Sequence, residues 1–237
     1  MRRVADGLRL AGSVVISNIW LMEDPSGRRF VVDTGHPLER MTLRASLWRA
    51  GVRGRGDLTA VLLTHRHSDH AGNAAWLRRT YGCPVICHER DADILTGNKP
   101  APPLARGVAA LYEEVLCHIE DRFPARTPVD ELYDEGAWKW GFRVVPVPGH
   151  TEGSVMLYHE PTRTLFSGDA ILTGPPPLRA IEYLRLAVPG FSLHVDGCRD
   201  AVRGFLRELP PVSAVAAGHG PLLRKDAENR LRRLLHR

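Results

Sequence analysis

The sequence predicts an α/β fold, in which short buried strands alternate with helices along the first half of the chain. The clearest sign is the short apolar run Ala60–Leu63, which a polar turn and a helical segment from His70 to about Thr80 follow directly. A second strand and helix come next, at Pro84–Cys87 and His88–Leu95. The second half returns to short strands rich in β-branched or aromatic residues, at Phe142–Val147, Ser154–His159 and Thr164–Ser167.

The remaining segments follow from turn residues and apolar spacing. We expect the chain to open with strands at about Arg9–Ser17, Asn18–Glu23 and Arg28–Val32. Helices are expected at Leu38–Ala50 and Ala105–Arg122, an exposed loop at Thr96–Pro103 and an irregular segment at Phe123–Val129. No repeat of the solenoid type is visible in the sequence.

Length and composition favour one large domain over residues 1–237, with a second domain possible but not required; we expect a small-molecule substrate, and the spread of charge argues against a nucleic-acid partner. The chain has 237 residues, of which 43% are hydrophobic and 25% charged. The net charge is +5, but the arginines and lysines are spread along the chain, whereas nucleic-acid proteins concentrate them with aromatic residues. The densest basic cluster, Arg224–Arg237, carries leucines at helical spacing, so we favour a surface helix over a binding site for an anionic partner.

The four cysteines form no C-x-x-C pair, and they favour reduced, mostly buried thiols in a cytoplasmic protein. The start of the chain superficially resembles a signal peptide, but Asp6 and Arg9 interrupt it and no cleavage site follows cleanly. No apolar run approaches the length needed to span a membrane, and the sequence does not indicate an oligomeric state.

A dense group of metal-ligand residues follows the run Ala60–Leu63. The segment T-H-R-H-S-D-H places His65, His67, Asp69 and His70 on the turn between a strand and a helix. Because alternate residues of an extended segment point the same way, His65 and His67 can address one ion, and the turn directs Asp69 and His70 to a neighbouring point. The alternative is an ordinary polar loop, which the ligands found downstream argue against.

Three further ligand candidates follow apolar stretches and are flanked by glycine: His150 in P-G-H-T, Asp169 in S-G-D and His219 in G-H-G. Glycine permits the positive φ and close backbone approach of tight loops, so these loops can converge at one edge of a sheet. Each motif alone is weak evidence for a metal ligand, since a Gly-His pair can simply form a turn. Together with the first group they supply seven ligands, which suits two metal ions.

The motifs H-x-H-x-D-H, G-H-T, S-G-D and G-H-G, with the early D-T-G at Asp33–Gly35, resemble the metallo-β-lactamase superfamily from about Asn18 to Leu222. The resemblance implies a four-layer αβ/βα sandwich, with two mixed sheets face to face, helices outside and metals at one edge. It further implies that His65, His67 and His150 hold one ion, that Asp69, His70 and His219 hold the other, and that Asp169 bridges them. The three-histidine set suits zinc, and the mixed set also accepts iron or manganese.

Departures from particular members of that superfamily narrow the expected activity. The zinc β-lactamases have cysteine or serine where this chain has Asp169, and glyoxalase II enzymes carry an extra helical domain, for which the 18 residues after His219 leave no room. The RNA-cleaving members usually carry an exosite or a second domain, and neither is evident. We therefore expect a compact hydrolase of esters, thioesters or lactones.

The chemistry of such a site supports hydrolysis. Two cations about 3.5–4 Å apart can hold a hydroxide between them and polarise a carbonyl oxygen, so the nucleophile comes from solvent. We expect Asp69 and Asp169 to act in catalysis as well as in metal binding. A mononuclear iron dioxygenase that oxidises glutathione persulfide resembles the same motifs and stays open as an alternative. A non-enzymatic binding protein is disfavoured because all seven positions are filled.

Residues outside the ligand set are assigned more weakly. Asp33 is expected to orient the metal loop, and His36, Tyr183 and His194 are candidates for the pocket wall, with a structural role favoured for each. The loop Thr173–Pro189 has the composition of a lid or pocket wall. The other histidines lie in no motif and are interpreted as ordinary core or surface residues: His88, His118, His159 and His236.

Overall fold

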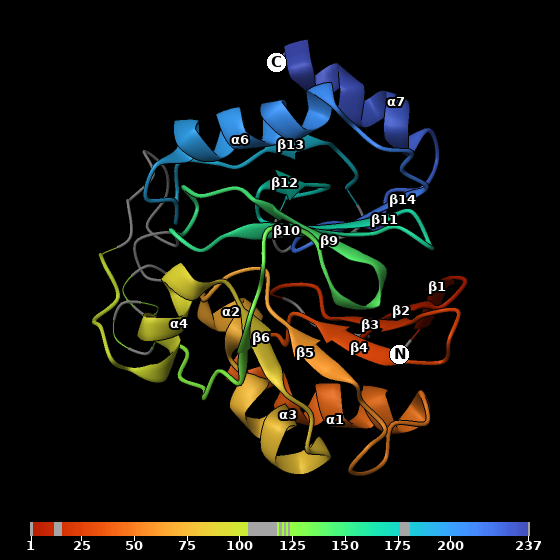
Figure 1. Ribbon diagram of the computed structural model, residues 1–237, viewed down its shortest axis with the longest axis vertical. Helices are drawn as coiled ribbons and strands as arrows, with labels where there is room; N and C mark the ends of the chain where they lie inside the picture. The colour runs from red at the N-terminus through yellow and green to blue at the C-terminus, as the bar shows by residue number, and fades with distance from the viewer. Residues whose placement is uncertain are drawn as a thin grey trace.

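The computed structural model describes residues 2–11, 16–103, 118, 120, 122, 124–175 and 181–236. Within these ranges two β-sheets face each other, with helices on the outer side of each (Figure 1). The expected four-layer α/β sandwich is therefore confirmed. Most of the helix expected at Ala105–Arg122 lies outside the described residues, as do four residues of the strand expected at Arg9–Ser17 and five of the loop Thr173–Pro189.

The first sheet follows chain order. Its described strands are β1 (Arg2–Ala5), β2 (Leu8–Leu10), β3 (Trp20–Glu23), β4 (Arg29–Val32), β5 (Ala60–Leu62), β6 (Val85–Cys87) and β7 (Glu131–Leu132). The strands from β1 to β4 pair antiparallel, and those from β4 to β7 pair parallel. The parallel half arises because the helices α1 (Arg40–Arg49), α3 (Ala74–Tyr81) and α4 (Glu89–Thr96) lie in the connections between its strands.

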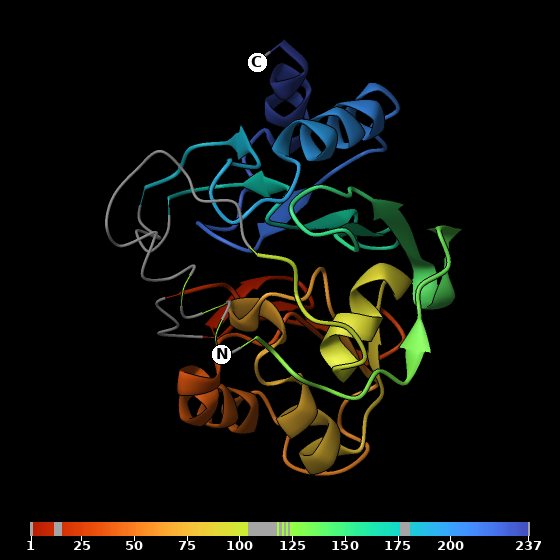
Figure 2. The same cartoon turned by 90° about the vertical axis from the view of Figure 1, so that its left-hand side faces the viewer.

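The second sheet has the described order β14-β11-β10-β9-β8. Its strands are β8 (Gly136–Ala137), β9 (Phe142–Pro146), β10 (Val155–His159), β11 (Thr164–Gly168) and β14 (Ala214–Ala217), and only β11 and β14 pair parallel. A small separate pair joins β12 (Ile171–Leu172) to β13 (Arg185–Leu186). The segment from β7 to β8 passes from the first sheet to the second along one side of the molecule (Figure 2).

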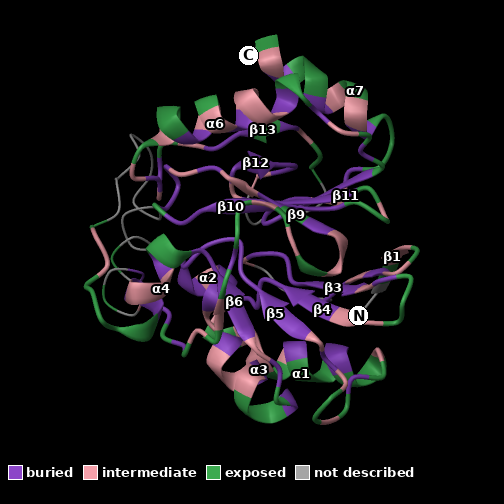
Figure 3. Ribbon diagram, in the orientation of Figure 1, coloured by how far each residue is buried: buried purple, intermediate pink, exposed green. Residues whose placement is uncertain are grey.

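Successive side chains of each strand point to opposite faces of its sheet, which gives the layers of the fold. In β4, Phe30 and Val32 point between the sheets, whereas Val31 points to the cluster beneath α1 and α3. In β10, Leu157 points between the sheets and Met156 toward α6 (Val195–Arg207) and α7 (Ala227–Arg232). Both faces of each sheet are therefore buried, and exposed residues lie mainly on the outer faces of the helices and in loops (Figure 3).

Some boundaries differ from the sequence expectation for local reasons. The strand expected at Asn18–Glu23 begins at Trp20, because the backbone of Asn18 donates to the Gly218 carbonyl oxygen instead of to a strand (2.6 Å). The helix expected from His70 to Thr80 is divided into α2 (Ser68–Ala71) and α3. The division falls at Asn73, whose amide donates to the carbonyl oxygens of three residues of the loop after β4. Strand β1 was not expected.

Two further expectations agree with the structure. The basic C-terminal segment forms α7 and a 3₁₀ turn at Arg233–His236, with Leu231 and Leu234 buried. Cys83, Cys87 and Cys198 are free and buried, and Cys117 lies outside the described residues. Further 3₁₀ turns lie at Pro37–Glu39 and Lys139–Gly141. Among the described helices, none is long and apolar enough to cross a membrane.

Candidate metal centre

Seven side chains predicted as ligands meet at one edge of the two sheets. His65 and His67 follow β5, Asp69 and His70 lie in α2, and the other three follow β9, β11 and β14: His150, Asp169 and His219. Because β11 and β14 run parallel and β9 points the same way, their carboxyl ends share one edge. The fold therefore brings together residues that lie more than 150 positions apart.

One cluster consists of His65, His67 and His150. Their ligand atoms lie within 4.8 Å of one another, and their ring centroids are 4.7–4.8 Å apart. The Nε2 atom of each ring is buried and has no hydrogen-bond partner. Since buried polar atoms are otherwise satisfied in folded proteins, three convergent orphan nitrogens fit a cation that completes them.

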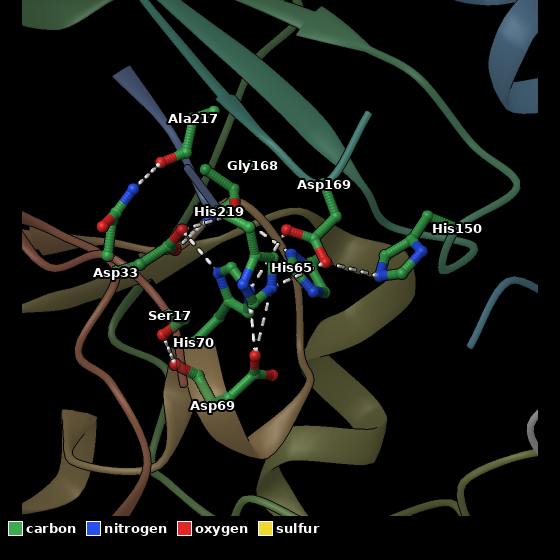
Figure 4. A network of polar contacts seen from close by, with 12 residues as sticks. Ser17, Asp33, His65, Asp69, His70, His150, Gly168, Asp169, Ala217 and His219 are labelled. Atoms are coloured by element: carbon green, nitrogen blue, oxygen red, sulfur yellow. Dashed lines mark hydrogen bonds and ion pairs between the residues drawn. The ribbon is translucent and has the colours of Figure 1, made fainter. Parts of the chain in front are cut away.

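The second cluster consists of Asp69, His70 and His219, whose ligand atoms also lie within 4.8 Å of one another. The Nε2 atoms of both histidines are 3.4 Å from Asp69 Oδ2 and 3.3 Å from oxygens of Asp169. Asp169 Oδ2 is also 3.6 Å from His150 Nε2. In Figure 4 the rings of His70 and His219 lie between the carboxylates of Asp69 and Asp169. Because the Asp169 carboxylate also faces His150, it stands between the two clusters.

The two clusters differ in charge. Burial holds the pKa values of His65 and His67 well below the usual range and lowers that of His150 to about 4. Neighbouring histidines of both clusters lower them further, since each would repel a second positive ring, while Asp169 acts in the opposite direction. These three rings are therefore neutral near neutral pH and present lone pairs to a metal.

In the second cluster burial acts to lower the pKa of His219, but Asp169 and Asp69 outweigh it and raise the value to about 9. The pKa of His70 is likewise raised well above its usual range, by Asp69, Asp169 and Asp33 against the effect of burial. In turn, His70 and His219 hold the pKa values of both carboxyls far below normal, although burial acts to raise them. Without a metal, this cluster is a network of ion pairs.

Hydrogen bonds to Nδ1 orient three of the rings. Asp33 accepts from His70 Nδ1 (2.8 Å) and from the Thr64 hydroxyl (2.8 Å), and the Thr64 oxygen in turn lies 3.1 Å from His65 Nδ1. Ser192 donates to the Val188 carbonyl oxygen, so its own oxygen accepts from His150 Nδ1 (3.0 Å). Each bond places the proton on Nδ1 and leaves Nε2 for a ligand bond.

Asp33 has a strained backbone. Its φ is 55°, a left-handed conformation that a non-glycine residue adopts only when its surroundings enforce it. Its carboxylate also accepts from the Thr64 backbone N–H (2.9 Å). The role predicted for Asp33, orienting the metal loop, is consistent with these contacts.

Glycine allows the ligand loops to approach. A Cβ atom on Gly218 would lie 2.3 Å from Asp169 Oδ1 and 2.5 Å from a ring carbon of His70. A Cβ on Gly149 would lie 2.3 Å from the His194 carbonyl oxygen, and its φ of 134° is one that side chains disfavour. The glycines beside His219 and His150 therefore serve the convergence that the sequence indicated.

The loop that carries His219 is also held by the start of the chain. The Asn18 amide donates to the carbonyl oxygens of Ala217 (2.9 Å) and Gly220 (2.7 Å), and the indole of Trp20 donates to Ala217 as well (3.1 Å). The ligand loop is therefore fixed by a segment about 200 residues earlier in the sequence.

Each of the three candidates for the pocket wall makes a defined contact. His36 caps the turn at Pro37–Glu39, Tyr183 stacks against Arg185, and the backbone of the exposed His194 donates to the Gly149 carbonyl oxygen. These contacts are structural, and a place for the three residues in the pocket wall stays a prediction. His88 caps α4, and His159 bonds to Thr162, so neither joins the cluster. His118 and His236 are exposed.

Sequence reasoning missed several supporting residues: Thr64, Asp91, Glu120 and Ser192. Both carboxylate oxygens of Glu120 accept from the Ser68 backbone N–H (3.1 and 3.0 Å), and burial raises the pKa of this carboxyl to about 7. None of these residues stands in a motif of metal-ligand spacing.

Residues 12–232 match the sequence model of the family described as the metallo-beta-lactamase superfamily. This chain belongs to that superfamily. Its buried histidines and partly buried aspartates form groups that can bind metal, as expected for a superfamily of metallo-hydrolases.

Individual proteins show the same relationship. The probable metallo-hydrolase YybB of Bacillus subtilis is 30% identical over 176 residues, which are 68% of this chain and 66% of YybB. A hydroxyacylglutathione hydrolase of Bdellovibrio bacteriovorus is 30% identical over 115 residues, 48% of this chain and 35% of the relative. The chain therefore spans less than two thirds of the length of either relative.

A solved structure, TTHA1623 in a di-iron-bound form, superposes on this chain with a TM-score of 0.62 and 26% sequence identity. The superposition covers 92% of this chain and 95% of that one. The two folds therefore agree over nearly their full lengths.

Proposed function

We propose that this protein is a dinuclear metallo-hydrolase that cleaves an ester, thioester or lactone bond. The observation that carries the proposal is the pair of ligand clusters on either side of Asp169. One cluster offers three neutral histidines with orphan Nε2 atoms, and the other offers a carboxylate with two histidines. Two cations suit this arrangement better than one, because each cluster is already a complete set of three ligands.

Bound divalent cations would polarise a carbonyl oxygen and activate water at neutral pH. The chain itself holds the ligand atoms in place through Asp33, Thr64 and Ser192. The carboxylate of Asp169 stands between the two clusters, where its negative charge would offset the mutual repulsion of two bound cations. The side chains of Asp69 and Asp169 remain 22% and 14% exposed, so this end of the site is open to water and substrate.

The comparisons support the choice of metal and bond. Three histidines suit zinc, and the second cluster also accepts iron or manganese, in line with the iron present in TTHA1623. The name of the Bdellovibrio relative denotes hydrolysis of an acylglutathione, which is a thioester. We therefore propose zinc as the main metal and a carbonyl compound with a thiol or alcohol leaving group as substrate.

Elemental analysis of the purified protein is the first test. We expect close to two metal ions per chain, mainly zinc, with some iron or manganese. A single tightly held iron, together with oxygen uptake on a thiol persulfide, would overturn the hydrolase proposal in favour of a persulfide dioxygenase.

A substrate panel is the second test. We expect turnover of at least one thioester, lactone or simple ester, abolished by a chelator and restored by zinc. His150→Gln should lose the activity, whereas His159→Gln, which changes a buried histidine bonded to Thr162, should keep it. Cleavage of a β-lactam or RNA without any ester or thioester cleavage contradicts the proposal.

Location and domain structure stay predictions. Cytoplasmic placement rests on the three buried free thiols, since proteins of oxidising compartments usually pair their cysteines. A single domain is proposed because both sheets contribute ligands to one centre.

A further inference from the structure

Asp91 is a buried carboxylate in α4 that belongs to none of the sequence motifs. Asp91 is 0% exposed and lies in the first turn of α4. Helix α4 packs at the side of the molecule where the two sheets meet, near the loops that carry the ligands (Figure 2). A buried charge is costly unless it is fully bonded, so the contacts of Asp91 indicate what it serves.

The carboxylate joins two ligand loops. Oδ2 accepts from the backbone N–H of Arg66 (2.9 Å), which lies between His65 and His67. The same oxygen accepts from the hydroxyl of Thr151 (2.8 Å), the residue after His150. Each loop is therefore bonded to one oxygen atom through a residue directly beside a ligand.

The second oxygen strengthens both connections. Oδ1 accepts from the backbone N–H of Gly153 (3.0 Å) and lies 3.9 Å from Nε of Arg66, whose side chain is 2% exposed. A Cβ atom on Gly153 would lie 2.6 Å from Asp91 Cγ, so only glycine allows this loop to approach α4 so closely. Burial raises the pKa of Asp91, while Arg66 and the three donor groups oppose that effect.

We propose that Asp91 is the positioning residue of the three-histidine cluster, fixing the distance between the His65/His67 loop and the His150 loop so that their Nε2 atoms converge. The inference rests on the metal centre proposed above but not on the bond that is cleaved. It assigns Asp91 to the first cluster, as Asp33 is bonded directly to His70 of the second. Three ligands from two loops need such a connection, since neither loop alone supplies a full set.

The test is a zinc titration of the metal-free full-length protein, followed through the imidazole nitrogen signals of individual histidines by NMR. In Asp91→Asn we expect the zinc concentration that saturates His67 and His150 to rise about 10–100-fold, and that for His219 to change less than about threefold. Asp24→Asn is the matched control. Asp24 is also a buried carboxylate that accepts from two backbone N–H groups and an arginine, but it lies in the turn between β3 and β4.

Removing the charge of Asp91 leaves the buried Arg66 without its partner, which can prevent folding. Thr151→Val therefore serves as a second variant, because it keeps the side-chain shape and the charge of Asp91. It removes the hydroxyl that donates to Asp91 Oδ2 and contacts the Ser154 hydroxyl, and it leaves the bond from the Gly153 backbone in place. We expect about a tenfold weaker affinity at the first cluster and an unchanged circular dichroism spectrum.

Unchanged affinity at the first cluster in Thr151→Val, or equal weakening of both clusters in a folded Asp91→Asn, would overturn the inference. Because zinc binding is measured without a substrate, a wild-type protein that binds zinc but cleaves no ester would contradict only the proposed function.

Discussion

The two ligand clusters can each accept a cation, but they differ in how their charge is balanced in the protein alone. His65, His67 and His150 are neutral, and their buried Nε2 atoms have no hydrogen-bond partner among the described residues. In the cluster of Asp69, His70 and His219, opposite charges compensate one another before any metal arrives. Similar residue types, a few ångströms apart, can therefore differ in protonation. Burial keeps the histidines of one cluster neutral, and neighbouring carboxylates keep the histidines of the other protonated.

A cation therefore replaces something different in each cluster. At the three-histidine cluster it supplies partners to atoms that have none. At the second cluster it must displace the protons that the raised pKa values of His70 and His219 hold in place. We expect the first cluster to bind the tighter ion near neutral pH.

The largest effect is expected from Asp169→Asn, which keeps the shape of the side chain that stands between the clusters but removes its charge. Occupancy of the second cluster should fall more than that of the first, and kcat should drop on the order of 10²-fold or more. Metal analysis and steady-state kinetics measure both, with Asp24→Asn as the control. Two retained ions and near-normal turnover would mean that Asp169 does not bridge.

Asp33→Asn tests the charged support of the second cluster. Losing the carboxylate that accepts from His70 Nδ1 should weaken the second ion about 10–100-fold. The first ion should weaken less, because Asp33 reaches His65 only through the Thr64 hydroxyl. Site-resolved zinc titration separates the two ions, and a larger loss at the first cluster would reverse the roles assigned here.

The pH dependence of binding should differ between the clusters. Below the pKa of about 9 of His219, the second ion must release a proton, so its affinity should rise about tenfold per pH unit and per proton from pH 6 to pH 8. His150, with a pKa of about 4, is already neutral there, so the first ion should release none. Calorimetry in two buffers of different ionisation enthalpy counts the protons. Equal release from both clusters contradicts the comparison.

The smallest effect is expected from Ser192→Ala. It removes the neutral hydroxyl that accepts from His150 Nδ1, and neutral hydrogen bonds contribute less than those to a carboxylate, about 1 kcal/mol. The first ion should therefore weaken by roughly tenfold or less, which a competitive chelator assay can measure. A loss of zinc affinity as large as that of Asp33→Asn would show that the charge of Asp33 does not make its bond to His70 stronger than the bond of Ser192 to His150.

Local patterns in the sequence predicted the alternation of strands and helices and the convergence of the candidate ligands, whereas the four-layer sandwich followed from the resemblance to a known superfamily. Apolar runs placed β5, β9 and β11 to within about two residues, and ligand types at the strand ends identified the edge where His65 and His219 meet. The metal-binding roles of those residues stay predictions, whereas their convergence is a property of the fold. The boundaries at Trp20 and Asn73 were missed because contacts with distant loops set them.

The supporting residues could not be found in the same way. Asp91 and Glu120 contact the ligand loops only after the chain has folded, and neither has a ligand spacing in the sequence. A carboxylate that accepts backbone N–H bonds looks, in sequence, like any acidic residue of a helix. The charge difference between the clusters was equally hidden, because it depends on which carboxylates face which rings.

The hydrogen bonds from the Asn18 amide to the carbonyl oxygens of Ala217 and Gly220 determine when, during synthesis, the last ligand loop can be fixed in place. A nascent chain can build the first sheet and its helices early, but the last ligand loop leaves the ribosome about 200 residues after its anchor. The candidate metal centre therefore closes only after the loop that carries His219 has been synthesised. Chains that stop before β14 would retain His65, His67 and His150 yet lack the closing loop, so metal binding at the second cluster would distinguish chains with this loop from chains without it.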